Sequence, residues 1–363
     1  MGFFAEALSF PKDCPFNQEC IQELKGLTCA DGTSSYFTII PRRNTENVLI
    51  FFFGGGACWD WTTCSSGMAL NLTRKPPSQD WENGQGIFNR QDPKNPFRDY
   101  TIVTVPYCTG DVYVGDAEIN HGDADYPYVL KHKGYDNAFS TLKVASELFH
   151  DAKKVVLMGT SAGGIGAFTH MRNLNRFFPR AQKYVISDAG TPFQPPYVSD
   201  KTYEKVLVNW NAYKGFPVDD LNRPASDFGK VLEFNRKRFP HIKFGLIHSY
   251  ADYVMSGFSY ALGAADATTA VRDTLIAAAN QQIGTNNSNQ KVFYTESWGH
   301  TFTNFNLGET QSLGVTLADW LNGMLNEGPW ENIRPDLGKD IYPWMPFTPG
   351  PGQLQEIPVF YND

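Results

Sequence analysis

The chain has 363 residues, a formal net charge of −7, and 42% hydrophobic but only 19% charged residues. This length allows a large buried core, and 27 Phe, 17 Tyr and 8 Trp exclude a disordered chain. The acidic balance argues against a nucleic-acid partner, and no apolar run approaches the ~20 residues that span a bilayer.

Seven β-rich runs are predicted, and most are continuously apolar, as expected for strands buried on both faces of a sheet. They cover residues 36–40, 48–53, 100–105, 154–158, 183–187, 243–247 and 291–295. Helical patterns separate the later runs, at residues 135–150, 164–178, 225–237, 266–282 and 311–326. This alternation predicts one α/β domain over residues 1–363 with a mostly parallel sheet flanked by helices.

Long stretches without a clear period interrupt this pattern at residues 57–98, 108–133 and 191–224. Each follows closely on a predicted strand, where open α/β sheets bind ligands, so we expect lid-like functional loops. A Cys-containing segment (residues 1–35) and a Pro-rich tail (residues 328–363) are expected to wrap around the body.

A serine turn follows the fourth predicted strand, where the apolar run stops at Gly159-Thr160-Ser161-Ala162-Gly163. A strand that bends sharply into a helix presents the serine at the bend and requires small residues two positions to either side. We therefore expect Ser161 to be a nucleophile, with the amide of Ala162 pointing at an oxyanion.

A serine nucleophile needs a general base, and a histidine on a late loop after a strand is the usual source. His300 follows the last predicted strand and is the first choice, with His248 as second. The orienting carboxylate should lie between Ser161 and His300, after a strand. Asp252 and Asp188 both meet this condition, and position favours Asp252.

A second oxyanion donor is expected from Gly54-Gly55-Gly56, which ends an apolar strand as esterase glycine loops do. A phosphate-binding loop is the competing interpretation, but the GxGxxG spacing and the Gly-Lys-Ser/Thr ending are both missing.

Six cysteines lie in the first third of the chain, at spacings that match no zinc site. A disulfide could close the short loop from Cys58 to Cys64. An even count in loops favours an oxidising compartment, secreted or periplasmic, over free thiols in a cytosolic enzyme. The start of the chain lacks a signal peptide, as it would after cleavage. Neither a metal nor an organic cofactor is expected.

Several blocks together resemble the pectin acetylesterase and Notum family of α/β-hydrolase serine carboxylesterases. They are Gly-Gly-Gly-Ala-Cys-Trp from Gly54, Val-Pro-Tyr-Cys-Thr-Gly-Asp-Val from Val105, the serine turn, Ser-Asp-Ala-Gly from Ser187, and Gly299-His300. The likeness points to a bacterial or other non-plant branch.

This resemblance implies specific roles. Ser161 would be the nucleophile, Asp252 the acid and His300 the base, with Asp188 structural. The oxyanion amides would be those of Gly55, Gly56 and Ala162, and Cys58–Cys64 would match a family disulfide.

The leading hypothesis is an esterase that removes a short acyl group, such as acetyl, from a polysaccharide such as pectin. Alternatives are an esterase or lipase for longer acyl chains, including a Notum-like deacylase or polyester hydrolase, and a catalytically silent binding module. A monomer is expected. The cleft would be lined by Trp59, Tyr113, Tyr253 and Trp298, with Trp61 as a further candidate.

Overall fold

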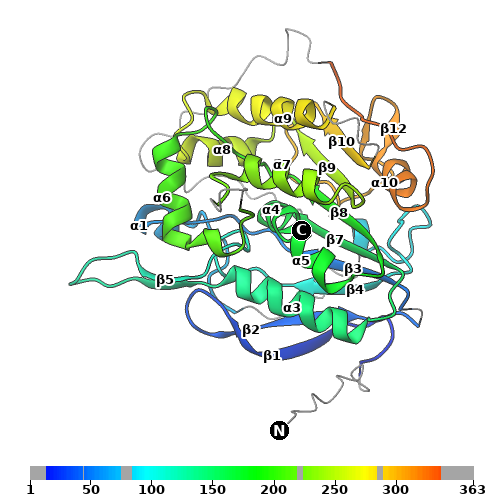
Figure 1. The fold of residues 1–363 in the computed structure, drawn as a ribbon, viewed down its shortest axis with the longest axis horizontal. Coiled ribbons are helices and arrows are strands. Elements are labelled where there is room, and N and C mark those ends of the chain that lie inside the picture. The colour runs from blue at the N-terminus through cyan, green and yellow to red at the C-terminus, as the bar shows by residue number, and fades with distance from the viewer. Residues whose placement is uncertain (1–13, 44, 75–83, 219–223, 284–288, 337–363) are drawn as a thin grey trace.

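An eight-stranded sheet forms the centre of the computed structural model, which describes residues 14–43, 45–74, 84–218, 224–283 and 289–336 (Figure 1). Its strand order is β1-β2-β4-β3-β7-β8-β9-β10. The strands are β1 (Cys20–Thr28), β2 (Ser34–Ile40), β3 (Asn47–Phe52), β4 (Thr101–Val105), β7 (Lys154–Thr160), β8 (Gln182–Asp188), β9 (Lys243–Ser249) and β10 (Gln290–Thr295). Only the β1/β2 and β2/β4 pairs are antiparallel, which confirms the predicted α/β-hydrolase class with a mostly parallel sheet.

Helices cover both faces of this sheet. They are α1 (Trp61–Ser65), α3 (Gly134–Leu148), α4 (Ala162–Thr169), α5 (Met171–Phe177), α6 (Asp200–Trp210), α7 (Phe228–Arg238), α8 (Tyr253–Ala261), α9 (Ala267–Ile283) and α10 (Leu317–Leu325), with 3-10 turns η1 (Gly86–Phe88) and η2 (Ala212–Lys214). Small hairpins are formed by β5 (Ala117–Asn120) with β6 (Val129–His132) and by β11 (Gln311–Ser312) with β12 (Val315–Thr316). None of the helices in the described ranges is long and apolar enough to cross a membrane.

Strand β3 shows why both faces are apolar. Val48, Ile50 and Phe52 pack into the core beneath α3, α4 and α7, whereas Leu49 and Phe51 pack into a second core against α10. All five side chains are fully buried. Alternate residues of a strand point to opposite faces, so a continuous apolar run is what a two-sided core requires.

All seven predicted strands are present, but two helix predictions need correction. The predicted helix at residues 164–178 is divided at His170, whose ring donates a 2.9 Å bond to the carbonyl oxygen of Tyr113 and accepts a 2.9 Å bond from the side-chain amide of Asn173. The predicted helix at residues 311–326 begins only at Leu317, because the β11–β12 hairpin occupies its first part.

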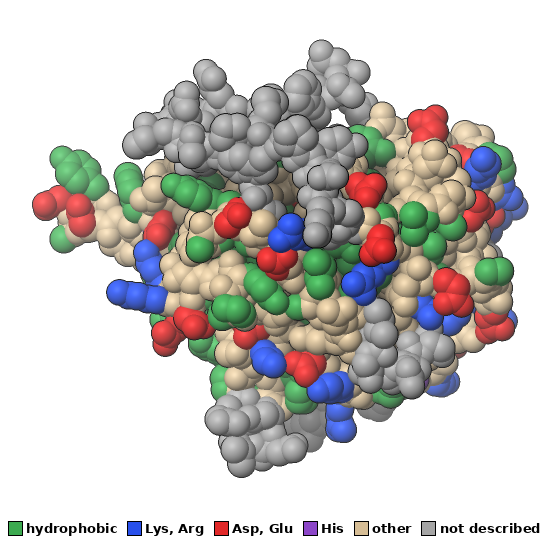
Figure 2. Space-filling view, turned by 90° about the horizontal axis from the view of Figure 1, so that it is seen from above, with side chains coloured by type: hydrophobic (Ala, Val, Ile, Leu, Met, Phe, Trp, Pro, Cys, Tyr) green, Lys and Arg blue, Asp and Glu red, His purple; other side chains and the backbone are tan. Residues whose placement is uncertain are grey.

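The aperiodic stretches contain local structure of their own: α1, the β5–β6 hairpin and α6. The hairpin projects from the body (Figures 1 and 2). Tyr126 in its connecting loop and Val129 at the start of β6 are exposed. Ile333, in the first part of the Pro-rich tail, forms backbone hydrogen bonds with Val292 and Tyr294 of β10. Residues 1–13 of the Cys-containing segment and residues 337–363 of the Pro-rich tail lie outside the described residues, so the prediction that they wrap around the body is not tested there.

Candidate active site

Ser161 lies at the bend between β7 and α4 with φ 54° and ψ −120°, a region that residues with a side chain rarely occupy. A Cβ on Gly159 would lie 2.2 Å from the carbonyl oxygen of Gly163, and one on Gly163 would lie 2.0 Å from that of Phe52. Both contacts are impossible, so the two glycines are required for the bend. Strain of this kind is typical of functional positions.

His300 and Asp252 form a hydrogen-bonded pair, with 2.8 Å between Nδ1 of the imidazole and Oδ2 of the carboxylate. Asp252 is fully buried and caps α8, where its Oδ1 accepts a 2.9 Å bond from the amide of Met255. Burial by itself would lower the pKa of His300, but the charge and hydrogen bond of Asp252 outweigh it and raise the pKa above 6.5. Because Nδ1 of His300 is bonded to Asp252, Nε2 is the ring nitrogen that remains to accept a proton.

Asp188 has a different position from Asp252. Its buried carboxylate accepts bonds from the amides of Phe302 and Thr303, both at 2.8 Å, and from the Thr303 hydroxyl at 2.7 Å. It therefore holds the loop that follows His300. Burial raises the pKa of Asp188, and the three donors oppose that rise.

His248 is buried beside the pair rather than on the open side of the site. Its Nε2 bonds the hydroxyl of Thr191 at 2.7 Å, and its Nδ1 lies 2.9 Å from the carbonyl oxygen of Ser249. The Nδ1 atom is 3.9 Å from the Asp252 carboxylate, and burial lowers the His248 pKa. Both ring nitrogens are engaged, which is typical of a structural histidine.

The glycine loop lies next to the serine turn. A Cβ on Gly54 would approach Cβ of Ser161 to 2.9 Å, and Gly55 and Gly56 have φ values of 149° and 75°. Within the described ranges, no acceptor bonds the amides of Gly55, Gly56 or Ala162. Free amides on two neighbouring loops are the donors that an oxyanion hole needs.

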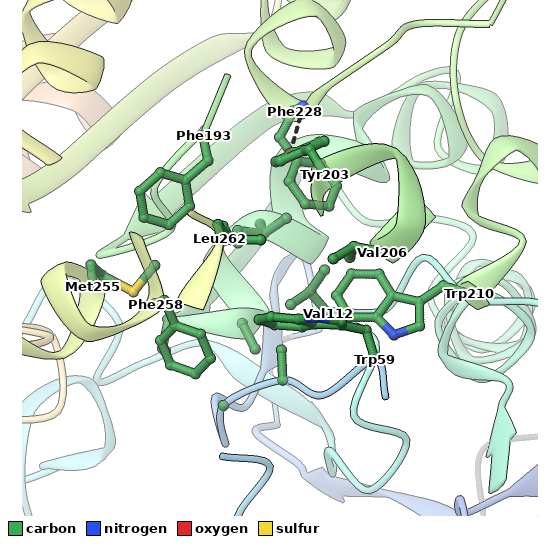
Figure 3. A pocket seen from close by; sticks show the side chains of 15 residues that line it. Trp59, Val112, Phe193, Tyr203, Val206, Trp210, Phe228, Met255, Phe258 and Leu262 are labelled. Atoms are coloured by element: carbon green, nitrogen blue, oxygen red, sulfur yellow. Dashed lines mark hydrogen bonds between the residues drawn. The ribbon is translucent and has the colours of Figure 1, made fainter. Parts of the chain in front are cut away.

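An apolar pocket of about 470 Å³, its open mouth included, adjoins Ser161 (Figure 3). None of the described side chains that line it is charged. The fifteen lining residues come mainly from the loop after β3, from α6 and from α8: Gly56, Ala57, Trp59, Val112, Ser161, Ala162, Ile165, Phe193, Tyr203, Val206, Trp210, Phe228, Met255, Phe258 and Leu262.

Of the four predicted cleft residues, Trp59 lines this pocket and Tyr113 does not. Tyr113 is 1% exposed, stacks on Phe52, and its hydroxyl lies 2.9 and 2.8 Å from the carbonyl oxygens of Phe53 and Val105. The prediction of a substrate contact is therefore wrong for Tyr113, which is a core residue.

Tyr253 and Trp298 are instead surface residues, 44% and 46% exposed, and are joined by a 3.5 Å backbone hydrogen bond near the Asp252–His300 pair. Trp61 is also exposed, on α1, where it packs edge-on against Tyr128.

The pocket residues on α6 were not predicted from the sequence. Tyr203, Val206 and Trp210 follow helical spacing after Ser199, whose hydroxyl caps the helix by accepting from the Thr202 amide. The helical spacing of these residues and the serine cap are the sequence features that would have predicted this helix.

Three disulfides join the six cysteines: Cys14–Cys20, Cys29–Cys108 and the predicted Cys58–Cys64. The Cys58–Cys64 loop supports the pocket wall, because the indole of Trp210 donates a 2.7 Å bond to the Cys58 carbonyl oxygen.

Comparisons with known proteins identify the fold and the family of this chain. The solved structure of the Wnt deacylase Notum from Drosophila superposes with a TM-score of 0.66 at 17% identity, over 88% of this chain and 97% of that one, and so shares the fold. The palmitoleoyl-protein carboxylesterase notum2 of Xenopus laevis is 29% identical over 157 residues, 40% of this chain and 29% of the relative. Pectin acetylesterase 11 of Arabidopsis thaliana is 26% identical over 204 residues, 53% of this chain and 51% of the relative.

These alignments span about half or less of the curated relatives' length. The family model described as pectinacetylesterase matches residues 12–229, more than half of the chain and including the serine turn. The chain belongs to the pectinacetylesterase family.

Proposed function

We propose that the protein is a serine carboxylesterase. Ser161 Oγ attacks the ester carbonyl carbon while His300 Nε2 takes the hydroxyl proton, and the amides of Gly55, Gly56 and Ala162 stabilise the oxyanion. The ester C–O bond breaks, and the alcohol leaves with the proton from His300. Water, activated by His300, then releases the acid and restores Ser161. Asp252 holds the imidazole and stabilises its charged form.

The observation that carries this proposal is the position of Ser161. The strained serine lines an apolar pocket together with Gly56 and Ala162, two of the three expected oxyanion donors. A silent binding module has no need of this strain, nor of the 2.8 Å Asp252–His300 bond.

The substrate is an ester whose acyl group enters the pocket. The family points to acetyl esters on a polysaccharide such as pectin, which stays our first candidate. The second is a longer acyl chain, which the walls of the pocket support, because aromatic and aliphatic side chains from α6 and α8 line the space beside Ser161.

We further propose that the enzyme acts as a monomer outside the cytoplasm, in a secreted or periplasmic location. Its three disulfides support an oxidising compartment.

Ser161→Ala tests the mechanism with 4-nitrophenyl acetate and a fluorophosphonate probe, and Ser146→Ala, at a half-buried serine on α3 whose hydroxyl bonds the carbonyl oxygen of Lys143, is the matched control. We expect turnover and labelling to be lost only in Ser161→Ala. Unchanged turnover in that variant would exclude this mechanism. A substrate series from acetate to octanoate then separates the two acyl classes.

A further inference from the structure

Two histidines of the β5–β6 hairpin face each other outside the esterase site: His121 directly follows β5, and His132 is the last residue of β6. Nε2 of His121 lies 2.9 Å from Nε2 of His132, and their rings are 5.2 Å apart at 72°. His132 is fully buried and His121 is half-buried, so the pair is reached from the surface through His121. The proposed esterase mechanism uses neither residue.

The orientation of His132 is fixed. Its Nδ1 lies 2.7 Å from the carbonyl oxygen of Thr109, so this nitrogen carries the proton and donates. Nε2 of the neutral ring therefore presents a lone pair to His121. Metal-binding histidines are typically oriented in this way, by a second bond from the far ring nitrogen to a carbonyl oxygen.

One ion pair faces the two rings. The charges beside His121 are those of Asp60 and Lys205, which bond each other at 2.8 Å, so the two opposite charges are paired with one another.

A sulfur atom of the Cys58–Cys64 disulfide lies beside the pair. Sγ of Cys64 and one ring nitrogen from each histidine lie within 4.8 Å of one another. Two nitrogens bound to one Zn²⁺ at about 2.0–2.1 Å are roughly 2.9–3.4 Å apart for angles between 90° and tetrahedral. The observed 2.9 Å lies at the lower end of this range.

We propose that His121 and His132 form a binding site for a divalent transition metal ion such as Zn²⁺, separate from the esterase site. With Cys58–Cys64 intact, the two imidazoles are the protein ligands and water completes the coordination. A free Cys64 thiolate would add a third ligand, which makes the set typical of zinc.

The proposed metal site adjoins the wall of the apolar pocket. The His132 ring is 6.4 Å from that of Trp210, which lines the pocket and bonds the Cys58 carbonyl. Metal binding is nevertheless measured without substrate, so failure of this proposal is distinguishable from failure of the esterase proposal.

Calorimetric titration of the chelator-treated, fully oxidised protein with ZnCl₂ tests the site. We expect one ion per chain with micromolar affinity, weakened at least ten-fold by His121→Ala and unchanged by His241→Ala. His241 is the matched control, a surface histidine bonded to Asn175. Absence of binding, or equal affinity in His121→Ala, would overturn the proposal.

A second pair of variants tests Cys64 as a third ligand. It leaves His132 unchanged, because replacing this fully buried residue would destabilise the fold. Cys58→Ser frees the Cys64 thiol, whereas Cys58→Ser/Cys64→Ser removes the same disulfide and leaves no thiol. We expect Zn²⁺ to bind the single variant at least ten-fold more tightly, and Co²⁺ to give a thiolate charge-transfer band only there. Equal affinities and spectra would show that Cys64 is not a ligand and would overturn that part of the proposal.

Discussion

The backbone N–H of Ser161 donates a 2.8 Å hydrogen bond to the carbonyl oxygen of Asp188, whose side chain holds the loop that follows His300. One buried residue at the end of β8 is therefore bonded to both the serine turn and the histidine loop. The proposed nucleophile and base come from segments far apart in sequence, and Asp188 gives them a shared anchor.

Asp188→Ala is expected to lower both kcat and stability. It leaves the amides of Phe302 and Thr303 buried without their acceptor, at a cost of about 1–3 kcal/mol each. Thr303→Val, which removes only the hydroxyl bond, should have a smaller effect on both quantities. Urea unfolding and 4-nitrophenyl ester hydrolysis measure them side by side. A full kcat in folded Asp188→Ala would show that the anchor does not position His300.

Asp252→Asn is expected to move the acidic limb of the pH–rate profile to lower pH while lowering kcat. His300 must be neutral to accept a proton, and Asp252 stabilises its protonated form, which raises the pKa above 6.5. In the native protein, activity should therefore rise with pH through a midpoint above 6.5. Loss of the carboxylate charge removes this stabilisation. An unchanged midpoint of kcat/KM would contradict the pairing.

The predicted strands were correct because the apolar runs are long and buried on both faces, as in β3 and β7. The aperiodic insertions were harder to interpret. Helix α6 has apolar residues at Tyr203, Val206, Leu207 and Trp210 and a serine cap, but it is a single helix within a long stretch of irregular sequence. The hairpin β5–β6 is short, and its pairing depends on contacts that no local pattern indicates.

Some residues of the candidate site could likewise be predicted from the sequence, and others could not. Ser161 and its flanking glycines carry a local steric requirement, so sequence is enough to find them. The burial of Tyr113 depends on Phe52, sixty-one positions earlier, and an aromatic residue in a loop does not reveal whether it faces core or cleft. The Cys29–Cys108 disulfide could not be predicted for the same reason, because it joins segments that are far apart in sequence.

Gly163→Ala is expected to abolish folding or activity, since its Cβ would lie 2.0 Å from the carbonyl oxygen of Phe52. Gly257→Ala is the matched control: this glycine lies in α8 with nothing within 4 Å of the added Cβ. The control should stabilise the protein by about 0.5–1 kcal/mol, because alanine favours the helix. Soluble yield, melting temperature and ester hydrolysis separate the two variants. Normal activity in Gly163→Ala would refute the steric requirement.

Removal of Cys29–Cys108 is expected to cost more stability than removal of Cys14–Cys20. The first pair is 79 positions apart and the second only 6, so chain entropy predicts roughly 4–5 against about 2 kcal/mol. Double serine variants, unfolded in urea without reductant, measure this difference. Equal losses would mean that loop length does not control the contribution of these disulfides.

Filling the pocket is expected to change acyl-chain selectivity. Val206 on α6 lines the pocket, whereas Val208 on the same helix is 57% exposed. If the acyl chain lies in the pocket, each buried methylene contributes about 0.8 kcal/mol, roughly a four-fold gain in kcat/KM. Val206→Phe should then reduce kcat/KM for 4-nitrophenyl octanoate at least ten-fold and for the acetate less than two-fold, while Val208→Phe changes neither. Equal losses on both esters would show that the pocket does not hold the acyl chain and would favour the acetyl substrate.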